Sequence, residues 1–197
     1  VRDKGASTTA QRVAAVQERL GRQILLENPS AYLAWRGSTM AEWEFLAELS
    51  RRADCGILLD VNNVHVSARN LGFDPLAYLA GIPPDRVGQL HLAGHADKGR
   101  WLLDSHDAPV PPPVWDLYRE ALSRLRAAGL AYPCFCSRAE VAAAAQAPHG
   151  PGDDGPRYPG TCRDLSGGER AERARRRPPA WRFRVPEGAV TFADGVH

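Results

Sequence analysis

Apolar and polar residues follow a repeated strand-and-helix pattern along the first half of the chain. Short apolar runs centred on Leu25, Leu58 and Leu90 predict three strands at nearly equal separations. Apolar residues at helical spacing predict helices beside them, over residues 8–20, 41–52 and 74–79. Strands that are apolar along their whole length are typical of parallel sheets covered by helices on both faces. The pattern therefore predicts an α/β fold.

The regular spacing of these units favours a segment of a (β/α) TIM barrel, with a doubly wound sheet as the structural alternative. A long helix is predicted over residues 114–128, and the residue composition of the chain changes after it. Two shorter helices, two strand-like runs and a Pro/Gly/Asp-rich loop are predicted over residues 139–147, 168–177, 181–185, 190–192 and 148–156. We therefore predict a partial barrel over residues 1–120 and a small α+β module over residues 121–197.

Charge is distributed unevenly between these parts. Residues 124–197 carry 12 arginines against 8 acidic side chains, whereas residues 1–123 carry a small excess of acids. An arginine-rich segment suits a phosphate-rich partner, and a solvated helix face is the alternative. No apolar run approaches the ~20 residues of a membrane span, and the N-terminus is polar. We therefore expect a cytoplasmic protein with no membrane partner.

Each predicted strand of the first half ends in a side chain that can bind a metal: Glu27, Asp60 and His91. Further candidates follow closely, namely His65, His95, Asp104, His106 and Asp107. Mixed carboxylate and imidazole ligands suit iron, manganese or zinc, and barrel active sites lie at the carboxyl ends of the strands. An acid at a strand end also often caps the next helix. The repetition over three strands favours a metal site.

Four segments in this region occur in the order of a known family: 25–33, 58–67, 91–95 and 104–107. Over about residues 8–120 the chain resembles the multinuclear non-heme iron-dependent oxidative enzymes, a TIM-barrel family that modifies ribosomally made peptides, as in methanobactin biosynthesis. The resemblance implies iron, a peptide substrate and these metal ligands: Glu27, Asp60, His65, His91, Asp104 and His106. It also implies barrel strands before and after this segment.

Three of the four cysteines are clustered in the second half. Cys134, Cys136 and Cys162 offer three thiolates, and His149, Tyr158 or water could complete a tetrahedral zinc site. Three reduced, buried cysteines are the alternative. Cys55, just before the second strand, is predicted to be a buried thiol.

The segments 132–138, 158–163 and 179–186 resemble glutamyl-Q tRNA(Asp) synthetase, a relative of glutamyl-tRNA synthetase. This resemblance covers about residues 121–194. It implies zinc bound by Cys134, Cys136, Tyr158 and Cys162, with tRNA as the partner. The ATP-binding motifs of that family are not found here, so no adenylate-forming site is expected.

Together the two resemblances predict a fusion of two truncated enzymes, with a zinc-binding C-terminal module and no complete catalytic site. No catalytic residue is assigned. Two alternatives remain: an iron-dependent oxidative enzyme acting on a peptide, and a tRNA-glutamylating ligase.

Overall fold

The computed structural model describes residues 3–145, 158 and 160–185. These residues form two compact units that divide between Leu125 and Arg126. Each unit is described by itself. His149 and the runs predicted over residues 148–156 and 190–192 lie outside the described residues.

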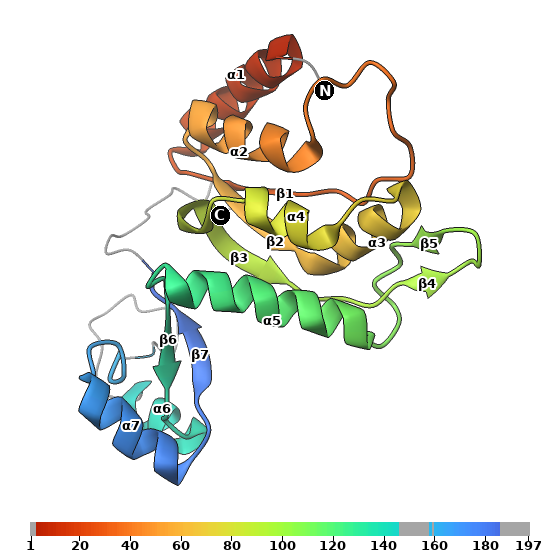
Figure 1. Cartoon of the computed structure of the whole chain (residues 1–197). Coiled ribbons are helices and arrows are strands. Elements are labelled where there is room, and N and C mark those ends of the chain that lie inside the picture. Colours follow the sequence, from red (N-terminus) through yellow and green to blue (C-terminus); the bar gives the residue numbers. More distant parts are fainter. Residues whose placement is uncertain (1–2, 146–157, 159, 186–197) are drawn as a thin grey trace, which may run out of the picture. The chain divides into compact units, whose positions relative to one another are not determined.

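The first unit is built on a parallel sheet in the order β1-β2-β3. Its strands are β1 (Leu25–Glu27), β2 (Gly56–Asp60) and β3 (Val87–His91). Figure 1 shows them side by side. The three predicted strands and the α/β class are therefore confirmed, although the described residues form no closed barrel. The register pairs Asp60 with His91, so both residues lie at the carboxyl end of the sheet.

Helices α1 (Asp3–Leu20), α2 (Glu42–Ala53) and α4 (Pro75–Gly81) lie where the apolar spacing predicted them. Helices α1 and α2 pack against each other through a small apolar core. Ala10 and Val13 of α1 meet Leu49 of α2 there, together with the buried thiol of Cys55. Burying such aliphatic side chains stabilises the unit by about 1.5–3 kcal/mol for each large residue.

Helix α3 (Val61–Leu71) follows β2 directly and was not predicted from the sequence. Its residues include Val61, Val64 and Val66, which favour strands. Its polar residues Asn62, Asn63 and Ser67 are buried, so they do not mark a side that faces solvent. The Asp60 side chain caps this helix by accepting a hydrogen bond from the backbone N–H of Asn63, and Gly72 ends it in a left-handed conformation.

A short 3₁₀ turn, η1 (Pro84–Arg86), leads into β3. A small antiparallel hairpin, β4 (Ala96–Asp97) and β5 (Leu102–Leu103), then precedes α5 (Pro112–Ala127). Figure 1 shows α5 running alongside β3. Across the part of the chain that the structure describes, each helix is too short or too polar to cross a bilayer.

The second unit pairs β6 (Ala131–Cys134) with β7 (Ala180–Phe183) in an antiparallel ladder. Helices α6 (Arg138–Ala145) and α7 (Gly167–Arg176) complete it. Ser166 caps α7 in a reciprocal pair of hydrogen bonds with Glu169. The core of this unit consists of Tyr132, Cys134, Phe135 and Cys162, so the cysteines are part of its packing.

Candidate metal centres

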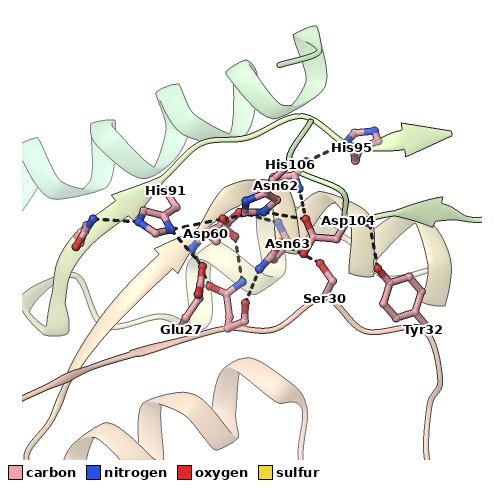
Figure 2. Close-up of polar contacts among 12 residues, drawn as sticks. Glu27, Ser30, Tyr32, Asp60, Asn62, Asn63, His91, His95, Asp104 and His106 are labelled. Carbon is pink, nitrogen blue, oxygen red and sulfur yellow. Dashed lines mark hydrogen bonds and ion pairs between the residues drawn. The ribbon is translucent and has the colours of Figure 1, made fainter. Parts of the chain in front are cut away.

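The carboxyl ends of the three parallel strands bring Glu27, Asp60 and His91 together. One potential ligand atom from each lies within 4.8 Å of the others. His91 Nδ1 is 3.2 Å from Glu27 Oε1 and 3.8 Å from Asp60 Oδ2. Figure 2 shows the side chains converging from β1, β2 and β3. Strand ends that are far apart in the sequence thus form one donor cluster, as the positions of these residues predicted.

Asp60 lies at the centre of this cluster and is fully buried. Its Oδ1 accepts the capping hydrogen bond from Asn63 at 2.9 Å. Its Oδ2 is buried and has no hydrogen-bond partner among the described residues. Burial raises the pKa of this carboxyl, because the charged form loses its hydration. A buried carboxylate oxygen without a donor fits a cation as its missing partner.

Asp104 and His106 extend the cluster from the loop after β5. His106 Nε2 lies 2.8 Å from Asp104 Oδ1 and 3.6 Å from Asp60 Oδ2. His106 has a backbone φ of 56°, in the left-handed region that a non-glycine residue rarely adopts. Five of the six residues predicted as ligands in this unit are therefore linked by these contacts.

His65, the sixth predicted residue, contacts a different side chain. Its ring stacks on that of His95, with centroids 5.1 Å apart. His95 Nδ1 in turn lies 2.8 Å from Asn62 Oδ1. Burial lowers the pKa of both histidines, which favours their neutral forms. His65 therefore connects to the cluster through His95 and Asn62.

Buried asparagines that sequence reasoning did not single out support these candidate ligands. Asn62 donates to Asp104 Oδ1 at 3.0 Å. Asn28 exchanges two hydrogen bonds with the backbone of Asp60, and Asn63 donates to the backbone carbonyl of Asn28. Ser30 donates to Asn63 Oδ1 at 2.9 Å. The sequence signal that could have identified these polar residues is their position shortly after the apolar strands.

The second unit contains a separate donor cluster made of three cysteines and a tyrosine. The sulfur atoms of Cys134, Cys136 and Cys162 lie within 4.8 Å of one another. The Tyr158 hydroxyl oxygen is 3.2 Å from Cys134 Sγ and 3.8 Å from Cys136 Sγ. The backbone N–H of Cys162 donates to this oxygen at 3.1 Å. The four residues predicted as zinc ligands thus converge.

Electrostatics at this cluster suits a cation. Burial opposes ionisation of Cys134, yet hydrogen bonds with Tyr158 and Arg182 bring the pKa of its thiol down to about 7. Burial and the neighbouring cysteines raise the pKa of Cys136 to about 11. Burial and the same cysteines also raise the pKa of the Tyr158 hydroxyl. Each donor that loses its proton thus makes it harder for its neighbours to do so. A bound cation would offset this repulsion, because it stabilises all the deprotonated donors together.

Comparison with known proteins assigns the first unit to a family. The family model described as "RiPP precursor modification enzyme MbnB/TglH/ChrH" matches residues 2–131. A UPF0276 protein of Anaeromyxobacter sp. is 68% identical over 114 residues, which cover 58% of this chain and 40% of that protein. UPF0276 proteins of Rhizorhabdus wittichii and Acaryochloris marina are 58% and 53% identical, over 57% and 58% of this chain and 40% and 42% of theirs.

The chain therefore belongs to the MbnB/TglH/ChrH family, and it spans about two fifths of the length of these curated relatives. This result supports the resemblance predicted for residues 8–120. It favours the peptide-modifying alternative over the interpretation as a fusion with a tRNA ligase. The resemblance of residues 121–194 to glutamyl-Q tRNA(Asp) synthetase stays a prediction from their motifs, because the family match ends at residue 131.

Proposed function

We propose that the first unit carries part of a metal-dependent site that modifies a ribosomally made peptide, with iron as the metal. Membership of a family described as RiPP precursor modification enzymes supports the substrate class. The single observation that carries the metal site is Asp60 Oδ2, a buried carboxylate oxygen that faces two imidazoles and has no donor among the described residues.

The residues of the cluster have distinct roles in this proposal. Glu27, Asp60 and His91 would hold an ion, and Asp104 with His106 would supply further donors beside Asp60. Bound iron would supply one-electron and oxygen chemistry. The protein would fix the ligands in place: Asn62 orients Asp104, and the hydrogen bonds of Asn28 and Asn63 orient Asp60.

The iron site is tested by metal analysis of the full chain, purified under reducing, anaerobic conditions and reconstituted with ferrous iron. We expect bound iron that survives desalting in the native chain and is lost in Asp60→Asn. The amide keeps the Oδ1 acceptor that caps α3 but cannot supply a carboxylate. Glu18→Gln, an exposed change on α1, is the control. Equal iron in Asp60→Asn and the native chain would contradict the site.

A second function is favoured by a separate observation, the convergence of three sulfur atoms with the Tyr158 hydroxyl. We propose that Cys134, Cys136, Tyr158 and Cys162 bind one structural zinc ion. Cysteine-rich tetrahedral sites stabilise small units of this kind. The arginine-rich surface of α7 would then be available to tRNA, as the resemblance of this segment implies.

The zinc site is tested with Co²⁺ as the probe. Only thiolate ligation produces the near-ultraviolet sulfur-to-cobalt charge-transfer absorption, so any metal bound in the first unit does not contribute to it. We expect about one equivalent of Co²⁺ to produce this absorption and Zn²⁺ to displace it. Cys162→Ala should weaken the absorption strongly, whereas Cys55→Ala should not. A native chain without the absorption would contradict the site.

A further inference from the structure

Two arginines of the second unit reach the cysteine cluster from different elements. Arg173, on α7, places Nη1 3.7 Å from Cys162 Sγ. Arg182, on β7, lies beside the Cys134 thiol and lowers its pKa. The guanidinium of Arg182 also lies over the Tyr158 ring, 3.8 Å from its centroid. Two fixed cations therefore contact three of the four donors.

The neighbouring arginines of this unit bind different partners. Arg177 donates to the backbone carbonyl of Phe135 at 3.0 Å, and Arg184 donates to that of Arg163 at 2.8 Å. Arg176, on the same helix as Arg173, pairs with Glu172 on an exposed surface. The contacts of Arg177 and Arg184 link separate segments of backbone, and the ion pair of Arg176 is exposed to solvent. Arg173 and Arg182 differ because they reach sulfur.

A metal site with three thiolates has an excess of negative charge. Three thiolates outweigh the charge of one divalent ion, and ionisation of the Tyr158 hydroxyl would add to the excess. Partly buried negative charge is costly unless it is paired or hydrogen-bonded. Hydrogen bonds from charged donors are stronger than neutral ones, and arginine keeps its charge at any pH that the fold tolerates.

We propose that Arg173 and Arg182 are positioning residues that set the metal affinity of the cysteine cluster by holding their positive charge beside its donors. This inference rests on the zinc site proposed above. Neither arginine binds the metal. They balance the charge of the thiolates, so the loaded site holds its ion more tightly than the same four donors would alone. Arg182 additionally fixes the Tyr158 ring by stacking on it.

The test measures zinc affinity of the full chain by competition against a chromogenic chelator. The variants are Arg173→Gln, Arg182→Gln and Arg182→Lys, with Arg176→Gln on the same helix as the matched control. The cobalt charge-transfer absorption of each variant gives a second measurement, because it reports whether the thiolates still ligate. Circular dichroism checks that each variant folds.

We expect each glutamine variant to bind zinc roughly 10–100-fold more weakly, the usual cost of removing an outer partner of a metal ligand. The absorption should keep its intensity, because the ligands remain. Arg182→Lys should recover part of the affinity through its charge, and Arg176→Gln should bind as the native chain does. If Arg182→Gln does not fold, Arg173→Gln carries the test. Zinc affinity unchanged in the glutamine variants would overturn the inference while leaving the zinc site intact. A native chain that binds no zinc would overturn both.

Discussion

Asn28 and Asp60 are joined by two hydrogen bonds that run from one side chain to both backbone groups of the other residue. Asn28 Nδ2 donates to the Asp60 carbonyl at 3.0 Å, and the Asp60 N–H donates to Asn28 Oδ1 at 2.8 Å. Both residues are buried. The asparagine thus continues the ladder between β1 and β2 just beyond the point where β1 ends. The position of the Asp60 carboxylate depends on this pair.

Replacing Asn28 tests this dependence. Asn28→Ala leaves a buried N–H and a buried carbonyl of Asp60 without their partners. We expect the free energy of unfolding to fall by roughly 2–6 kcal/mol, since each of the two groups costs about 1–3 kcal/mol. Urea denaturation followed by circular dichroism measures this change. Gln11→Ala, an exposed change on α1, should remain within about 0.5 kcal/mol of the native chain. A loss no larger than that of the control would show that the pair is dispensable.

The contact between Tyr78 and Glu42 predicts a pH dependence of stability in the first unit. The Tyr78 hydroxyl donates to Glu42 Oε1 at 2.9 Å, and burial raises the pKa of Glu42 although this hydrogen bond lowers it. The folded chain therefore holds the proton more tightly than the unfolded chain. The stability from this group is complete below its ordinary pKa of 4.5 and is lost as the pH rises through the raised pKa.

Glu42→Gln removes this titration. We expect the free energy of unfolding of the variant, relative to the native chain, to increase as the pH rises from about 4.5 towards neutrality. Tyr78→Phe should move the dependence to higher pH, because it removes the hydrogen bond that favours the charged form. Urea denaturation at a series of pH values measures both effects. A relative stability that does not change with pH would count against a raised pKa.

Gly94 predicts a steric limit in the loop between β3 and β4, next to His95. A Cβ at this position would lie 2.0 Å from the backbone oxygen of Ala108 and 2.7 Å from that of Pro109. Gly94→Ala should therefore separate this loop from the segment after His106, at a cost of about 1–3 kcal/mol or more. Thermal unfolding and iron retention are the measurements. Gly168→Ala, which meets open space in α7, should be neutral or stabilising.

Tyr158 allows an isosteric test of the proposed zinc site. Tyr158→Phe keeps the ring under Arg182 and removes only the oxygen beside Cys134. We expect zinc affinity to fall at least about tenfold, because losing a ligand should cost no less than losing an outer partner. Tyr132→Phe, whose ring also lies beneath an arginine, is the control. Equal zinc affinity in Tyr158→Phe and the native chain would exclude the phenol as a ligand.

The sequence alone indicated the parallel strands and the polar residues at their ends. Apolar runs at regular spacing are a local signal. In a parallel sheet the carboxyl ends of all the strands necessarily lie at the same end of the sheet. The grouping of Glu27, Asp60 and His91 therefore follows from their positions at the ends of the apolar runs. Four motifs in order also indicated the family that the comparison assigns.

Tertiary structure decided what local pattern does not encode. Helix α3 was missed because its strand-favouring residues are buried on nearly every side, and burial overrides propensity. His65 lies on α3, and its ring stacks on that of His95, because side-chain direction depends on packing. The roles of Asn28, Asn62 and Arg182 arise from contacts between residues distant in the chain. The sequence by itself determined which donors are present, and only the folded chain decided which of them meet.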